Sequence, residues 1–164
     1  MRETLKLFGF SFLLLLALLI GKAYSGYCKK RVRSLESLSL LLLRLEEGVS
    51  LFLSTPSSFF QDYEDEYLTE VGFLELVRSG ENMANAFRKT ARRMALDRQT
   101  EERLSLFFSD YGKSYKDGEL RRISIFQREL EEVLKRETEE ERGRVKLAYT
   151  LLFSAALGII ILLI

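Results

Sequence analysis

The chain has 164 residues, 30% of them charged, and a formal net charge of +1. This length favours one domain, and the near-neutral charge gives no global field that would attract nucleic acid. The chain has no histidine and a single cysteine, Cys28. These counts exclude histidine-based triads, thiolate zinc sites and an intrachain disulfide. The sequence also has no glycine-rich phosphate loop and no calcium loop. We therefore expect that the protein binds no cofactor and no metal and that it is not an enzyme.

Two runs without a charged residue lie near the two ends, at residues 7–21 and 147–164. With its neighbours, each approaches the roughly 20 residues that a helix needs to cross a bilayer. We therefore predict three segments: an N-terminal transmembrane segment over 1–26, a helical cytoplasmic domain over 27–144, and a C-terminal transmembrane segment over 145–164. A signal peptide cleaved after Ser25 is the alternative for the first run.

Basic residues flank the two runs on their inner sides. They are Lys22, Lys29, Lys30, Arg31, Arg33, Arg142, Arg144 and Lys146, whereas only Arg2 and Lys6 lie outside. The positive-inside rule therefore predicts that the middle domain is cytoplasmic and that both termini lie on the far side of the cell membrane.

After the first run, leucines recur at spacings of three and four residues. The stripe consists of Leu35, Leu38, Leu42, Leu45, Val49 and Phe52. This period predicts an amphipathic helix that leaves the membrane and stops before Pro56, with Thr55 as the cap of the next helix. That next helix is expected from Phe59 to Tyr67, with its aromatic side chains in the core.

A further short helix, with Val71, Leu74 and Val77, is expected to end at Gly80, and Asn82 or a neighbour is expected to start another. The helix after Asn82 carries four cations on its polar side. With two acids from the preceding leucine-striped helix, they form the candidate partner or lipid surface: Glu46, Glu47, Arg88, Lys89, Arg92 and Arg93. Nucleic acid is not expected there, because no aromatic residues are interleaved with the cations.

The last part of the domain is expected to contain two more helices. One starts at Thr100 and stops at Gly112, and the other starts with Asp117 as its cap. Residues 135–144 are almost all polar, which predicts a charged, solvated stalk that stays helical into the second apolar run. The whole pattern predicts an all-α fold, a compact bundle of about six helices between an N-terminal and a C-terminal transmembrane helix.

The order of several short motifs resembles the stage III sporulation protein AB family. The motifs are Leu45-Glu46-Glu47-Gly48-Val49, Thr55-Pro56, Ser79-Gly80-Glu81-Asn82 with Ala86-Phe87, Tyr111-Gly112, and the closing anchor over 146–164 with Tyr149 and Gly158. The resemblance covers nearly the whole chain. It departs from the family at Tyr115-Lys116, where a second Leu-Gly would stand.

The resemblance implies a function that the residues alone do not give. Members belong to the complex that builds a channel between mother cell and forespore, and their soluble domain is similar to the F-type platform protein of type II secretion and type IV pilus systems. The resemblance therefore implies a place in the mother-cell membrane facing the forespore. Implied partners are a cytoplasmic secretion-type ATPase, similar to stage III sporulation protein AA, and membrane channel or ring proteins of the same operon.

Two other functions stay open at this point. One is a platform fragment of a secretion or pilus-like system outside sporulation. The other is a membrane-bound hydrolase that would use carboxylates such as Glu46, Glu47 or Asp62, which stand where solvated helix charges normally stand.

Overall fold

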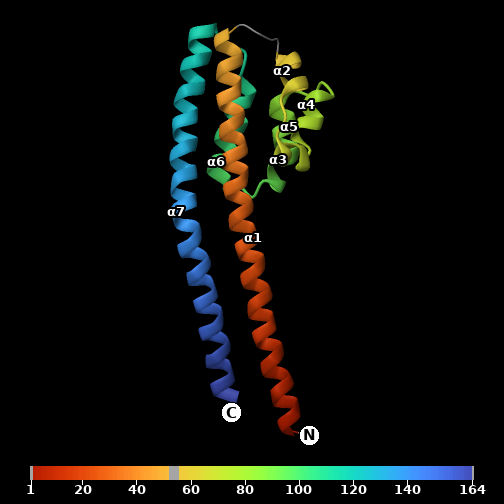
Figure 1. Ribbon diagram of the computed structural model, residues 1–164, viewed down its shortest axis with the longest axis vertical. Helices are drawn as coiled ribbons and strands as arrows, with labels where there is room; N and C mark the ends of the chain where they lie inside the picture. The colour runs from red at the N-terminus through yellow and green to blue at the C-terminus, as the bar shows by residue number, and fades with distance from the viewer. Residues whose placement is uncertain (1, 52–55, 164) are drawn as a thin grey trace. The chain divides into compact units, whose positions relative to one another are not determined.

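A computed structural model describes the backbone of residues 2–51 and 56–163, and all side chains within these ranges except those of 2–11, 13–14, 51, 56–58, 142, 159–160 and 162–163. In the described residues the chain forms α-helices, one 3₁₀ helix and no strand, so the all-α prediction is confirmed. The elements are α1 (Arg2–Leu51), α2 (Pro56–Asp62), α3 (Glu66–Glu70), α4 (Phe73–Arg78), α5 (Met83–Thr90), the 3₁₀ helix η1 (Ala91–Arg93), α6 (Arg98–Asp110) and α7 (Lys116–Leu163) (Figure 1).

The chain divides into two compact units. One comprises residues 1–29 and 137–164 and is called the terminal pair; the other comprises residues 30–136 and is called the head. Both α1 and α7 contribute to both units, because each helix continues across the division without a break.

The core of the head is built around the leucine stripe of α1. Leu35, Leu38 and Leu42 are fully buried, and Leu45 is nearly so, as the spacing predicted. Within the head, α1 and α7 run in opposite directions (Figure 1), and Lys116 Nζ donates to the carbonyl oxygen of Ser50 at 2.7 Å. The predicted helix end before Pro56 agrees with the bounds of α1 and α2, whereas Phe52 and Thr55 lie outside the described residues.

The single helix expected from Phe59 to Tyr67 is wrong, because the chain breaks between α2 and α3. The Asp65 carboxylate accepts a hydrogen bond from the Leu68 N–H at 2.7 Å and so caps α3. A capping carboxylate satisfies a backbone donor that the first turn leaves open, which favours a new helix start there. The aromatic residues still belong to the core: Phe60 and Tyr67 are buried, and Phe59 and Tyr63 pack against them.

Glycines separate the short helices that follow. Gly72 has φ 85° and splits the helix that was expected to contain both Val71 and Val77. Gly80 has φ 92° and ends α4, and the Asn82 side chain accepts from the Ala84 N–H at 2.9 Å. The predicted stop at Gly80 and the predicted cap at Asn82 are therefore confirmed, since only glycine adopts positive φ at low cost.

The connection from η1 to α6 contains a non-glycine residue with positive φ, Ala95 at 55°. Such a backbone costs about 1 kcal/mol or more for a residue with a Cβ. The helix start predicted at Thr100 is wrong: Asp97 is the cap, and Thr100 lies buried in the first turn of α6. Gly112, at φ 80°, follows the end of α6, as expected.

The last helix, α7, begins at Lys116 rather than with Asp117 as its cap, so Asp117 lies in the first turn. A carboxylate in the first turn is stabilised by the unpaired N–H groups and by the helix dipole. Asp117 therefore marks the start of α7 to within about one turn, although it is not the capping residue. The expected continuity is confirmed, because α7 passes Gly143 without interruption.

The terminal pair is held by small residues. Ala17 and Ala156 are buried, and a Cβ added at Gly21 would overlap the ring of Tyr149. Gly21 therefore lets an aromatic ring from α7 reach the backbone of α1. Over the residues that the structure describes, none of the helices combines the length and the apolar character of a membrane span, so the two predicted transmembrane helices are not confirmed.

Candidate functional site

The first two cations of the candidate surface, Arg88 and Lys89, are exposed in the last turn of α5. Arg88 donates to the Asn85 side chain at 2.7 Å, and Lys89 forms an ion pair with Glu81 at 2.7 Å. Both head groups are thus bonded to neighbours on or just before their own helix.

The other two cations, Arg92 and Arg93, lie in η1 and are exposed. Arg93 donates to the carbonyl oxygen of Val71 at 3.1 Å, at the C-terminal end of α3, where an arginine favourably meets the open carbonyl groups. Neither forms an ion pair with a carboxylate in the part of the chain that the structure describes. Lys89 is therefore paired with a described carboxylate, whereas Arg88 and Arg93 donate to neutral oxygen atoms.

The two acids of the candidate surface lie elsewhere, near the end of α1. Glu47 is exposed and pairs with Arg44 at 2.7 Å, and Glu46 is half-buried. Ser34, beside η1, lies 12 residues before Glu46, which is about 18 Å along an α-helix. The structure does not bring these acids together with Arg92 and Arg93.

The η1 end is fixed to α1 through one buried hydroxyl. Ser34 is 0% exposed, and its Oγ lies 2.5 Å from the Met94 carbonyl oxygen and 2.6 Å from Tyr67 Oη. Carbonyl oxygens only accept, so the single hydroxyl proton of Ser34 is shared between the carbonyl oxygens of Met94 and of Lys30, the latter 2.8 Å away, and Ser34 Oγ accepts from Tyr67. Burial raises the pKa of Tyr67, so this phenol keeps its proton at neutral pH.

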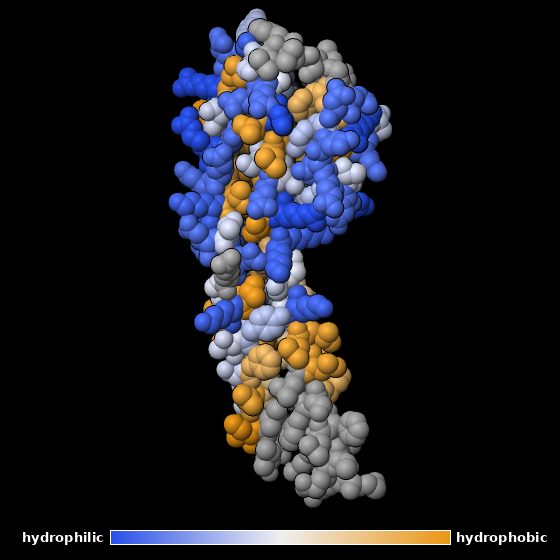
Figure 2. All heavy atoms as spheres, viewed as in Figure 1, coloured by the Kyte–Doolittle hydropathy of each residue, from blue (hydrophilic) through white to orange (hydrophobic). Residues whose placement is uncertain are grey.

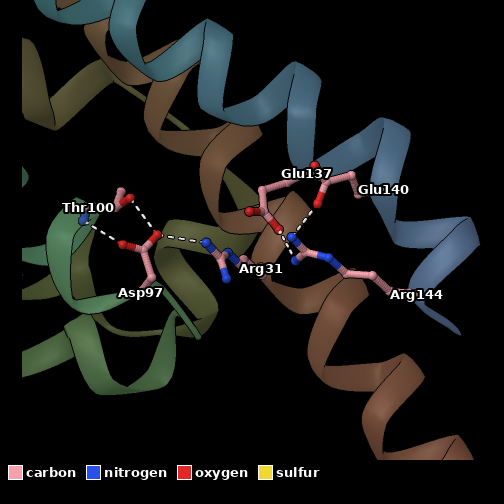
Figure 3. Close-up of polar contacts among 6 residues, drawn as sticks. All are labelled: Arg31, Asp97, Thr100, Glu137, Glu140 and Arg144. Atoms are coloured by element: carbon pink, nitrogen blue, oxygen red, sulfur yellow. Dashed lines mark hydrogen bonds and ion pairs between the residues drawn. The ribbon is translucent and has the colours of Figure 1, made fainter. Parts of the chain in front are cut away.

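An ion pair next to this hydroxyl joins α1 to the start of α6. Arg31 donates to the Asp97 carboxylate at 2.7 Å, and the same carboxylate accepts from Thr100 N at 2.9 Å and Thr100 Oγ1 at 2.6 Å (Figure 3). Burial acts to raise the pKa of Asp97, but the hydrogen bonds from Thr100 and the charge of Arg31 hold it below its ordinary value. This contact was not foreseen, because its partners are 66 residues apart.

An open polar groove of about 580 Å³ lies beside this ion pair, between α1, α6 and α7. It is lined by Arg31, Asp97, Gln99, Thr100, Arg103, Glu129, Glu132, Val133 and Arg136. Arg103 and Glu129 pair across it at 2.9 Å. The lining carries both signs of charge, and in the described residues no group of three side chains could hold a metal ion.

The stalk prediction needs a correction at one residue of the terminal pair. Glu137 is only 6% exposed, although nearly all of its neighbours in sequence are polar. Arg144 donates to Glu137 at 3.1 Å and also bonds Glu140 (Figure 3). A buried carboxylate needs a cationic partner, which Arg144 supplies. Because Glu137 is buried, one side of the predicted stalk is shielded from water.

Asp62, a candidate for carboxylate catalysis, is exposed at the end of α2. Of the residues that build the η1 end, Lys30, Arg31 and Asp97 were not candidates. Asp97 carried a usable signal, since Asp is among the residues preferred as a helix N-cap.

Comparison with known proteins identifies a family that matches most of the chain. The family model described as stage III sporulation protein AB matches residues 6–164. No curated protein and no solved structure matches the chain. A match over nearly the whole length includes the leucine stripe of α1, the glycine turns and all of α7. The chain belongs to the stage III sporulation protein AB family.

Proposed function

We propose that this chain is a non-enzymatic membrane platform of the channel complex between mother cell and forespore, and that it docks a secretion-type ATPase to the membrane. The family match carries the link to sporulation. The platform role draws support from the layout of α1 and α7, each of which contains an apolar run and part of the core of the head in one helix.

Membrane placement is supported by the surface of the terminal pair. Its described residues expose large apolar side chains, and Figure 2 shows orange atoms gathered on this unit. They include Phe12, Leu15, Leu19, Leu147, Leu151 and Ile161, of which Ile161 is 72% exposed. Apolar surface of this kind is costly in water and favourable in a bilayer, so we place the terminal pair in the mother-cell membrane facing the forespore.

The distribution of lysine and arginine supports the orientation. Cations concentrate on the chain between the two apolar runs, and Arg144 and Lys146 stand directly before the second run. In this proposal the head is cytoplasmic and both termini lie across the membrane.

The ATPase would meet an exposed apolar face of the head. On α1, Leu40 is 56% exposed and Leu43 is 39% exposed, on the side opposite the buried stripe. Glu47 continues this face one turn later. Leucines at spacing three beside an acid form a surface that a partner helix can cover.

Co-purification from sporulating cells in detergent tests this proposal. The wild-type chain should retain the ATPase and ring proteins of its operon and should hydrolyse no ATP by itself. Leu40→Glu with Leu43→Glu should lose the ATPase and stay in the membrane fraction, whereas Leu106→Glu, at a leucine of α6 that is 66% exposed, should keep it. Failure of the wild-type chain to retain any channel component contradicts the proposal.

A further inference from the structure

The head gathers cations at the end where α1 and α7 leave it. The head begins at Lys30 on α1 and ends at Arg136 on α7. The 3₁₀ helix η1 is brought to the same end, because the Met94 carbonyl accepts from Ser34, one turn after Lys30. Arg136 joins this end through the groove that it lines together with Arg31 and Asp97. We call this set the basic edge: Lys30, Arg92, Arg93 and Arg136.

The charges of the basic edge are not neutralised within the described residues. All four side chains are exposed, and no ion pair joins one of them to a described carboxylate. Nearby cations differ in this respect: Arg31 pairs with Asp97, Arg33 with Glu66, and Arg98 with Glu102. The basic edge therefore presents positive charge to whatever lies beyond the end of the head.

The covalent connections limit how far the basic edge can lie from the apolar runs. Between Lys30 and the first run stand residues 22–29, which span about 12 Å as an α-helix, and residues 137–146 before the second run span about 15 Å. The headgroup layer takes up about 5–8 Å of this distance. The remaining gap is close to the Debye length of about 8 Å, so charges on the edge act on anionic headgroups.

We infer that the basic edge binds the anionic lipid headgroups of the membrane that holds the terminal pair. This inference rests on the proposed membrane placement. Each cation near an anionic surface contributes about fivefold to the equilibrium between docked and undocked head. Docking would hold the head at one height above the membrane and keep the face with Leu40 and Leu43 open to the cytoplasm.

The test uses the full chain in nanodiscs. Cys28→Ser removes the one native thiol, and Gln99→Cys, at an exposed position of the first α6 turn, carries a fluorophore. A phosphatidylcholine with a spin-labelled headgroup quenches the fluorophore when the head docks. Quenching should be stronger in discs that contain phosphatidylglycerol than in discs of phosphatidylcholine alone, and it should fall with added salt.

Lys30→Glu with Arg92→Glu changes the charge of the edge by four units, which predicts a loss of at least about a hundredfold in the docked-to-undocked ratio. The matched control is Arg121→Glu with Arg128→Glu, at exposed positions of α7 away from the edge, where quenching should stay at the wild-type level. Circular dichroism should show equal helicity in both double variants.

Three results would overturn the inference. Quenching that is the same with and without phosphatidylglycerol would show that the head does not bind anionic headgroups. An equal loss of quenching in the Arg121→Glu with Arg128→Glu control would show that the basic edge is not responsible for docking. Binding of a labelled oligonucleotide that requires Lys30 and Arg92, with no dependence on lipid, assigns the edge to nucleic acid. Extraction of the wild-type chain from membranes by alkaline carbonate is a different failure, because it contradicts the membrane placement itself.

Discussion

Replacing Ser34 by alanine removes the hydroxyl that joins α1, α3 and the η1 end. The side chain is fully buried, so the Met94 carbonyl and the Tyr67 hydroxyl each lose a partner that water cannot replace. A buried group left without its hydrogen bond costs about 1–3 kcal/mol. Among the described residues, Tyr67 Oη keeps a long contact of 3.5 Å to the Arg93 carbonyl, and alanine regains a few tenths of a kcal/mol in helix propensity. The expected net loss is about 2–3 kcal/mol.

Urea unfolding of the full chain in detergent, followed by circular dichroism, measures this loss as a shift in midpoint at constant slope. Ser50→Ala is the control on the same helix, because its exposed hydroxyl donates to the Glu47 carbonyl at 3.1 Å, and its loss should cost less than about 0.5 kcal/mol. A double-mutant cycle with Tyr67→Phe should show coupling of about 1 kcal/mol. Additive effects, or a Ser34→Ala loss no larger than that of Ser50→Ala, would refute the reasoning.

Three further predictions concern the backbone and the phenols. Gly21→Ala should lower the melting temperature, because its Cβ overlaps the facing aromatic ring, whereas Gly26→Ala, with open space around it, should raise it through helix propensity. Ala95→Gly should stabilise the head by about 0.5–1 kcal/mol in urea unfolding, since glycine accepts φ 55° without strain; a loss of stability would contradict this. Burial, aided by nearby carboxylates, raises the pKa of Tyr63 and of Tyr111 to about 12 from the unfolded value near 10. Because a raised phenol pKa favours the neutral folded form, this stabilisation is complete below pH 10 and should be lost between about pH 10 and 12, with absorbance at the phenolate band and helicity changing together.

Local signals predicted much of the head. The leucine stripe of α1, the turn at Gly80, the cap at Asn82 and the stop at Gly112 each depend on a few neighbouring residues, and all agree with the structure. The wrong helix boundaries occur where the helical spacing of apolar residues continues across a break in the helix. Phe59 to Tyr67 keep helical spacing across the end of α2, so only the carboxylate cap of α3 marks the new start.

The candidate surface was harder to predict, because its charges depend on contacts made after folding. Arg88 and Lys89 are neighbouring cations on α5, yet Lys89 pairs with the Glu81 carboxylate whereas Arg88 donates to the neutral Asn85 side chain. The burial of Glu137 is a similar case, since it depends on Arg144 seven residues later. Such pairings depend on the folded geometry, which the spacing of apolar residues in the sequence does not reveal.

Because α7 passes through Gly143 without a break, the number of residues between two positions on this helix fixes the angle between their side chains around its axis. Each residue of an α-helix turns the chain by about 100° and advances it by 1.5 Å. Deleting one residue between Glu137 and Lys146 would turn everything beyond it by about 100°, whereas deleting seven would return it to within about 20°. Evolution can therefore change the length of this segment in pairs of turns more readily than one residue at a time.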